Sequence, residues 1–212
     1  MTITIKQLSL VLSGQAVLNN ISAVWTSDKT VGLVGHNGSG KTMLMRCLSG
    51  MVKNYDGLIM INDQIVGLDV DFPADMGLLL ETPGFIASMS AYHNLLTLAR
   101  LSGKAGRERV LDVLDLVGLG HTKKKPVGQF SLGMRQRLGI AQALLEFPRL
   151  LILDEPFNGL DRAGVDEIHA LLQDEKAKGT MLIVSSHHAS DIARLCDDVY
   201  ELENGRMRRM ET

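Results

Sequence analysis

One segment constrains this chain more than any other: a glycine-rich turn between an apolar run and a helix-forming run. Apolar residues 30–34 before the turn predict a buried strand, and residues 42–48 after it predict a helix that ends at Gly50. Strands that are continuous apolar runs and alternate with helices indicate an α/β fold with a mainly parallel sheet. The turn follows the pattern G-x-x-x-x-G-K-T and consists of Gly35, His36, Asn37, Gly38, Ser39, Gly40, Lys41 and Thr42.

The residue types of this turn suit a phosphate ligand. Glycines allow backbone N–H groups to point inward around phosphate oxygens, and the following helix presents its positive N-terminal end to the same anion. We expect Lys41 to bridge the β- and γ-phosphates and the Thr42 hydroxyl to ligate Mg²⁺. A glycine-rich turn by accident is the alternative, but the strand before it and the helix after it favour the phosphate site.

A second candidate site follows the apolar run 150–153, which ends in Asp154 and Glu155. A buried parallel strand delivers its last side chains to the carboxyl edge of the sheet, where ligands of such folds bind. Asp154 is expected to hold Mg²⁺ through water, and Glu155 to polarise the attacking water as a general base. The alternative is a solvated strand end with an ordinary turn at Pro156, which the phosphate-binding pattern disfavours.

Periodicity predicts the remaining organisation. Alternating apolar residues near the N-terminus indicate strands with one wet face, and residues 86–121 change to helical spacing, which indicates a helical insertion. Asn204-Gly205 predicts a hairpin turn. The other predicted elements are helices at 92–101, 108–117, 132–145 and from 165 to Gly179, and strands at 59–61, 181–184 and 199–207.

Composition excludes several classes of protein. The chain has 212 residues, 45% of them hydrophobic, so a disordered chain is excluded. Its net charge of −2 argues against a free-standing nucleic-acid binder. No apolar run reaches the ~18 residues of a membrane span, and MTITIKQLSL has no signal-peptide pattern. Two cysteines without CxxC spacing predict a reduced, cytoplasmic protein.

Three further motifs, in order along the chain, carry a family resemblance. Phe130–Arg137 (FSLGMRQR) resembles the LSGGQ-type signature of ATP-binding cassette (ABC) ATPases. Asn158–Asp161 resembles the D-loop that follows the catalytic glutamate of that family, and Ser186-His187 resembles its switch histidine. With the turn at 35–42, these motifs extend the resemblance over essentially the whole chain.

The resemblance implies a P-loop core of the ABC ATPase type with an N-terminal antiparallel β subdomain. It implies one domain over residues 1–212, with a nucleotide-binding core at 1–85 and 127–212 and a helical subdomain at 86–126. His187 is then expected to contact the γ-phosphate; alone, it would be a structural or surface histidine. Ser131 can both cap a helix and face a nucleotide held by a second subunit. The implied signature and D-loop contacts to nucleotide are Ser131, Gly133, Gln136 and Asp161.

Two positions depart from the family pattern. Glu81, within the stretch 76–85, stands where glutamine is usual, which is similar to the "E-loop" of the bacitracin/lantibiotic self-protection branch of bacterial exporters. The loop with Glu81 is expected to stay away from the phosphates in the nucleotide-free subunit and to swing in, so that Glu81 ligates Mg²⁺, only with Mg²⁺ and the membrane partner. A solvated loop carboxylate without catalytic effect is the alternative. Leu12 stands where most members have an aromatic residue against adenine, and aromatic stacking is worth roughly 1–3 kcal/mol in other settings.

The resemblance therefore implies the ATP-binding and ATP-hydrolysing subunit of an ABC exporter, with ATP and Mg²⁺ as cofactors. Two subunits, identical or different, would enclose ATP head-to-tail and drive a separate transmembrane permease from the cytoplasmic face of the membrane. No nucleic-acid partner is expected. One alternative is a non-transport ABC ATPase that acts as a soluble assembly factor. The other is a nucleic-acid-linked ABC protein, which usually has coiled-coil insertions or two cassettes, and neither is present here.

Overall fold

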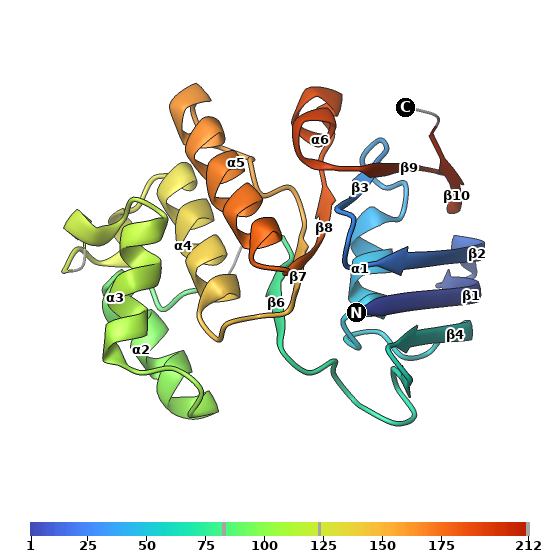
Figure 1. Cartoon of the computed structure of the whole chain (residues 1–212), viewed down its shortest axis with the longest axis horizontal. Helices are drawn as coiled ribbons and strands as arrows, with labels where there is room; N and C mark the ends of the chain where they lie inside the picture. The colour runs from blue at the N-terminus through green and yellow to red at the C-terminus, as the bar shows by residue number, and fades with distance from the viewer. Residues whose placement is uncertain (82–83, 123, 211–212) are drawn as a thin grey trace.

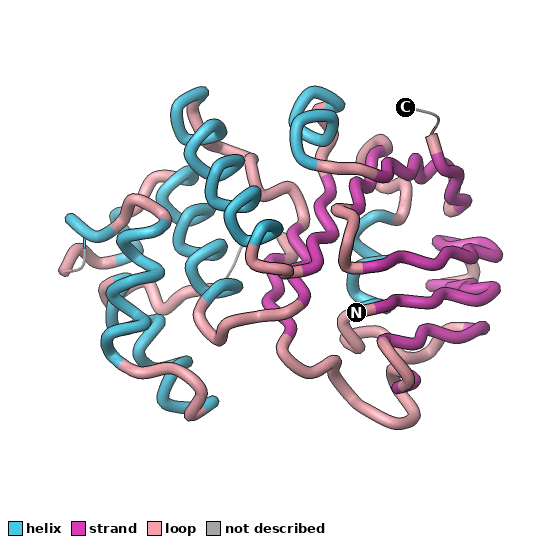
Figure 2. The backbone as a smooth tube through the Cα atoms, viewed as in Figure 1, coloured by secondary structure: helices cyan, strands magenta, loops and turns pink. Residues whose placement is uncertain are grey.

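The computed structural model describes residues 1–81, 84–122 and 124–210 as two β-sheets with helices packed around them (Figures 1 and 2). The strands are β1 (Thr2–Leu12), β2 (Gln15–Thr26), β3 (Val31–Val34), β4 (Asp56–Ile61), β5 (Gln64–Ile65), β6 (Met76–Leu79), β7 (Leu150–Leu153), β8 (Met181–Ser185), β9 (Asp198–Glu203) and β10 (Arg206–Arg209). The helices are α1 (Lys41–Leu48), α2 (Ala91–Ser102), α3 (Arg107–Leu116), α4 (Leu132–Leu144), α5 (Arg162–Ala177) and α6 (Ala189–Leu195), with short 3₁₀ turns η1 (Gly120–Thr122) and η2 (Val127–Gln129).

The larger sheet has six strands in the order β10-β9-β3-β8-β7-β6. Its strands from β9 to β6 run parallel, and β10 returns from β9 as an antiparallel hairpin. Alternate residues of β7 enter two different cores: Leu150 and Ile152 face one, and Leu151 and Leu153 face the other. Both faces of this sheet are covered, which explains why its central strands are continuous apolar runs.

The smaller sheet is antiparallel, in the order β2-β1-β4-β5. One side of β1 is buried, for example at Ile3 and Ile5, and it shares a core with α1 and one face of the larger sheet. In Figure 1, α1 lies between the two sheets. Trp25 of β2 packs on Tyr200 of β9, with ring centroids 5.6 Å apart. The helix α1, which follows the glycine-rich turn, therefore packs between the smaller sheet and one face of the larger sheet.

The helices α4 and α5 lie beside the larger sheet on the side away from α1 (Figure 1). The helix α3 packs on both α2 and α4, and Val113 and Leu114 of α3 are completely buried. The Ser90 hydroxyl caps α2 by accepting the backbone N–H of His93 at 3.3 Å. One buried cluster runs from α2 to the sheet, and the proposed subdomain boundaries at residues 86 and 126 stay a prediction.

The predicted fold class is confirmed: a mainly parallel sheet, an antiparallel N-terminal sheet and a helical insertion. The Asn204-Gly205 turn is confirmed as well, with φ of 50° and 75°. The sequence pattern does not predict β6 or α6. Only four residues form β6 within a stretch interpreted as a loop, and the seven residues of α6 are too few to establish a helical period.

Candidate active site

The glycine-rich turn connects the end of β3 to the start of α1. Gly35 has a φ of 149°, and a Cβ atom there would lie 2.3 Å from the carbonyl oxygen of Leu202, so only glycine fits. The turn and the start of α1 border a cavity of about 280 Å³. The N–H groups at the helix start are thus available to an anion in this cavity. Its lining comprises Val17, Asn37, Gly38, Ser39, Gly40, Lys41, Thr42, Met43, Asp154 and Glu155.

Lys41 is buried, with 6% of its surface exposed. Its ammonium group donates to the carbonyl oxygens of Gly35 at 2.6 Å and His36 at 3.2 Å. These bonds satisfy a buried cation and keep it within the turn, where it can also meet the oxygens of a bound phosphate. His36 is exposed and lines a neighbouring cavity of about 550 Å³ that Gly35 and His187 also line.

Asp154 joins three elements at the carboxyl edge of the sheet. It follows β7 directly and is 6% exposed. The Thr42 hydroxyl donates to its Oδ2 at 2.5 Å, and the Ser185 hydroxyl at the end of β8 donates to its Oδ1. Thr42 and Asp154 are 112 positions apart in sequence, so the fold itself brings them together.

This pair of oxygen donors fits Mg²⁺. Proteins usually hold Mg²⁺ with one or two protein oxygens and leave the other positions to water and substrate phosphates. Within residues 1–81, 84–122 and 124–210, no group of three or more His, Cys, Asp or Glu side chains is placed to hold a metal ion by itself. The Thr42–Asp154 pair therefore suits a metal ion that arrives with phosphates.

Glu155 and His187 are in contact, although the sequence predicts only a γ-phosphate contact for His187. The Glu155 Oε2 atom accepts hydrogen bonds from Nδ1 of His187 at 2.8 Å and from its backbone N–H at 3.2 Å. The Glu155 backbone has a left-handed φ of 49°, and its N–H donates to the Ser185 hydroxyl at 3.0 Å. These contacts hold the carboxylate at the mouth of the cavity, where it can accept a proton from a water molecule.

The signature segment lies at the start of α4, outside the lining of the 280 Å³ cavity. The Ser131 hydroxyl is exposed and caps α4 by accepting the backbone N–H of Met134 at 3.2 Å. A Cβ atom on Gly133 would lie 2.7 Å from the carbonyl oxygen of Gly159 in the D-loop. The signature segment and the D-loop therefore pack closely against each other.

Two of the expected nucleotide contacts have internal partners. Gln136 is 7% exposed, and its amide donates to the carbonyl oxygen of Glu155 at 2.8 Å. This arrangement differs from an exposed nucleotide contact and links α4 to the turn that carries Glu155. Asp161 caps α5 by accepting the backbone N–H of Gly164 at 2.9 Å.

Glu81 follows β6 and is exposed, with a φ of 55°. Its Oε1 atom lies 2.8 Å from Nη2 of Arg46 on α1, an ion pair that the sequence does not predict. The next two residues of this loop, Thr82 and Pro83, lie outside the described residues.

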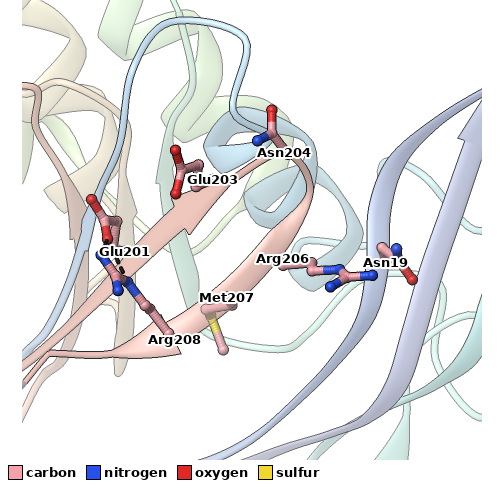
Figure 3. Close-up of a pocket in the computed structure, with 7 residues that line it drawn as sticks. All are labelled: Asn19, Glu201, Glu203, Asn204, Arg206, Met207 and Arg208. Carbon is pink, nitrogen blue, oxygen red and sulfur yellow. Dashed lines mark hydrogen bonds and ion pairs between the residues drawn. The ribbon is translucent and has the colours of Figure 1, made fainter.

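Other contributors escape sequence reasoning because they depend on the fold. The only sequence signal for Ser185 is that a serine ends an apolar strand. Val17 lines the cavity, whereas the residue singled out from the sequence, Leu12, is 41% exposed. A larger cavity, about 670 Å³, lies under the β9–β10 hairpin and contains none of the predicted site residues (Figure 3). There, Nε of Arg208 donates to Glu201 at 2.6 Å.

A family model described as "ABC transporter" matches residues 18–158, which include the glycine-rich turn, the signature segment and the Asp154-Glu155 pair. The chain belongs to the ABC transporter family. It is an ABC-type ATPase, as the sequence resemblance predicts. In family terms, the glycine-rich turn is the Walker A motif, and β7 with Asp154 and Glu155 is the Walker B motif.

This ABC ATPase is 42% identical over 92% of its length to an uncharacterized ABC transporter ATP-binding protein of Bacillus subtilis, covering 89% of that protein. It is 42% identical over 83% of its length to a bacitracin transport ATP-binding protein of Bacillus licheniformis, and spans 58% of that longer protein. It is 36% identical over 91% of its length to a lantibiotic transport ATP-binding protein of Streptococcus pyogenes, covering 83% of that protein.

Solved structures confirm the fold of the ABC ATPase. The dimeric post-hydrolysis state of an ATP-binding cassette bound to ADP and Pi has a TM-score of 0.86 at 20% identity, with 99% of each chain covered. A second cassette in its ADP conformation has a TM-score of 0.80 at 22% identity, with 98% of this chain and 90% of that chain covered. In the described part of the chain, no helix is long and apolar enough to cross a membrane.

Proposed function

We propose that this chain is the ATP-hydrolysing subunit of a bacterial exporter of the peptide-antibiotic, self-protection type. The observation that carries this proposal is its similarity, over most of the chain, to proteins named for bacitracin and lantibiotic transport. Glu81, at the position where most ABC ATPases have glutamine, agrees with the same branch.

Nucleotide binding follows from the Walker A geometry. The N–H groups of the turn and of the start of α1 would surround the β- and γ-phosphates, and Lys41 would exchange a loop carbonyl for a phosphate oxygen. Thr42 and Asp154 would hold Mg²⁺, which supplies positive charge to the phosphate oxygens. The base of ATP would lie towards Val17 and the N-terminal sheet.

Hydrolysis requires a group that accepts a proton from the attacking water. Glu155 fits this role because its carboxylate is fixed at the cavity by His187 and its backbone is fixed by Ser185. His187 is a donor in both of its contacts with Glu155, so it orients the carboxylate and would lie beside the γ-phosphate.

The exposed signature serine supports a site that is completed by a second subunit. Ser131 and the neighbouring Leu132, which is 55% exposed, lie outside the cavity of their own chain. In a head-to-tail dimer of identical or different subunits, this helix start would face the γ-phosphate held by the partner. The dimeric solved cassettes of the same fold support this arrangement.

A separate permease would convert dimer opening and closing into transport. Such a partner places this subunit on the cytoplasmic face of the membrane, and the similarity to transport proteins supports it. An assembly factor remains the alternative function. Co-expression with the membrane protein encoded beside this chain distinguishes the two: the exporter subunit co-purifies with it and restores bacitracin or lantibiotic resistance to a sensitive host, whereas an assembly factor co-purifies with a soluble scaffold protein.

The general-base assignment is tested by Glu155→Gln, which keeps the volume of the side chain and removes the base. We expect ATP hydrolysis to fall by about 100-fold or more, while binding of a fluorescent ATP analogue persists. Steady-state phosphate release and fluorescence titration measure the two properties.

The matched control is Glu108→Gln, because Glu108 is an exposed carboxylate in the first turn of α3. It should hydrolyse ATP at the parent rate. Near-parent turnover in Glu155→Gln would remove Glu155 from this role.

A further inference from the structure

Arg46 is a cation one turn of α1 after Thr42, whose hydroxyl is the proposed Mg²⁺ ligand. Thr42 and Arg46 are four residues apart on α1 and therefore lie on the same face of the helix. Nη2 of Arg46 lies 2.8 Å from Oε1 of Glu81. Among the described residues, Glu81 is the only carboxylate that Arg46 pairs with, and Nε of Arg46 is buried without a hydrogen-bond partner.

Glu81 and Glu155 occupy equivalent positions after two neighbouring strands of the larger sheet. The strands β6 and β7 are parallel neighbours in which Leu79 pairs with Leu153, and the Asp154 N–H donates to the Leu79 carbonyl oxygen at 2.7 Å. Each glutamate stands two residues after its paired leucine, and each has a left-handed φ, 55° for Glu81 and 49° for Glu155. Glu81 therefore begins at the edge of the sheet that carries the hydrolytic carboxylates.

The charges at this edge favour a cation next to Glu81. Glu81, Asp154 and Glu155 are three carboxylates, and Lys41 is committed to the Walker A turn. The Arg46 and Glu81 side chains are 36% and 61% exposed, and ion pairs this exposed shift an equilibrium by about fivefold at most. Arg46 thus neutralises Glu81 but holds it only loosely, so a divalent cation can displace it.

We propose that Arg46 is a positioning residue for Glu81 that competes with Mg²⁺ for its carboxylate. Arg46 holds Glu81 away from the metal before Mg²⁺ and ATP bind, and it releases the carboxylate when the metal attracts it. The competition raises the Mg²⁺ concentration needed to fill the site. The inference rests on the proposed function and on Glu81 as an additional, conditional Mg²⁺ ligand, as the E-loop resemblance implies.

A double-mutant cycle tests the competition without hydrolysis. All proteins carry Glu155→Gln, and the fluorescence of an added ATP analogue is followed as Mg²⁺ is titrated. The four proteins compared are the parent, Arg46→Gln, Glu81→Gln and the double variant. Arg46→Gln should lower the half-saturating Mg²⁺ concentration by about two- to fivefold when Glu81 is present, and by less than about 1.5-fold when Glu81 is replaced. Arg46→Lys, which keeps the charge, should stay close to the parent.

Equal shifts from Arg46→Gln in both backgrounds would overturn the inference, because they would reveal only the general loss of a positive charge. No shift in either background would overturn it as well. The matched control is Arg208→Ala, which breaks the exposed Arg208–Glu201 pair on the β9–β10 hairpin (Figure 3) and should leave the Mg²⁺ dependence unchanged. A parent that fails to bind the analogue with Mg²⁺ would instead contradict the proposed function.

Discussion

His169 is a titratable residue enclosed in the core beside the turn that follows β7. It lies on α5, is 2% exposed, and stacks on Phe157 with ring centroids 4.4 Å apart. In the described structure neither of its ring nitrogens has a hydrogen-bond partner. Burial lowers the pKa of His169 below its ordinary value, and Arg194 lowers it further, while Asp191 and Asp166 act in the opposite direction.

This lowered pKa makes the stability of the fold depend on pH in one direction. Below about pH 6.5 the unfolded chain binds a proton at His169 that the folded chain resists, so the free energy of unfolding falls as pH drops. The slope from this residue is at most about 1.4 kcal/mol per pH unit. We expect His169→Phe, which keeps an aromatic ring on Phe157, to lose less stability than the parent between pH 7.5 and pH 5.5.

Urea unfolding at a series of pH values measures the effect. A second variant, His169→Leu, guards against overpacking by the larger phenylalanine ring. If both variants lose as much stability as the parent on acidification, His169 is not the residue responsible.

At the scale of elements, the contact between α4 and the D-loop fixes the position of the signature segment. Gly133 stands in the first turn of α4, where the Gly159 backbone leaves no space for a side chain. Alanine would favour the helix by about 1 kcal/mol over glycine. A Cβ atom 2.7 Å from a carbonyl oxygen forces the backbone to move, and overpacking of this kind costs typically 1–3 kcal/mol.

We therefore expect Gly133→Ala to lower the free energy of unfolding slightly and to impair ATP-dependent association more strongly. Binding of an ATP analogue to the monomer should persist, because Gly133 is outside the cavity lining. Gly106→Ala is the control, because it lies at the start of α3 with open space around it. Association equal to the parent in Gly133→Ala would contradict a rigid α4–D-loop unit.

The elements that sequence reasoning predicts are those with long or strongly patterned runs. The helices α2 and α3 and the apolar strands β3, β7 and β8 have such patterns, and the glycine-rich turn identifies the loop between β3 and α1 by its residue types alone. The pairs Arg46–Glu81 and Gln136–Glu155 are absent from that reasoning. They join residues 35 and 19 positions apart, so only the packing of α1 and α4 against the sheet brings them together.

At the scale of the whole molecule, the proposed active site needs two chains. Ser131→Arg would place a bulky cation where the partner's γ-phosphate is expected. In the Glu155→Gln background, we expect this change to abolish ATP-induced dimers and to leave nucleotide binding by the monomer largely intact. Light scattering with and without ATP measures the association.

Ser102→Arg provides the control, because Ser102 is an exposed serine at the end of α2. It should dimerise like the parent. Normal dimers with Ser131→Arg would contradict the head-to-tail arrangement.

Some properties of the whole molecule follow from local sequence patterns, and others follow only from packing. Motif order along one chain predicts the family and the fold, and both are confirmed. The backbone carbonyl groups of Leu202 and Val17 pack against glycines of the Walker A turn, and Val17 also lines the cavity. Neither residue belongs to a motif, so only the fold reveals these contacts. The subdomain boundaries, the roles of the site residues and the dimer stay predictions.

The strand order has a consequence for how the protein is made. The strand β3, which carries the Walker A turn, lies between β8 and β9, and both neighbours come from the last part of the chain. At the usual speed of protein synthesis, β3 waits roughly 7 to 30 s on the ribosome before its first neighbour exists. Until then its two edges are open, and Asp154 lacks the Ser185 hydroxyl that contacts it beside Thr42. ATP can therefore stabilise the nascent chain fully only after β8 and β9 have been made.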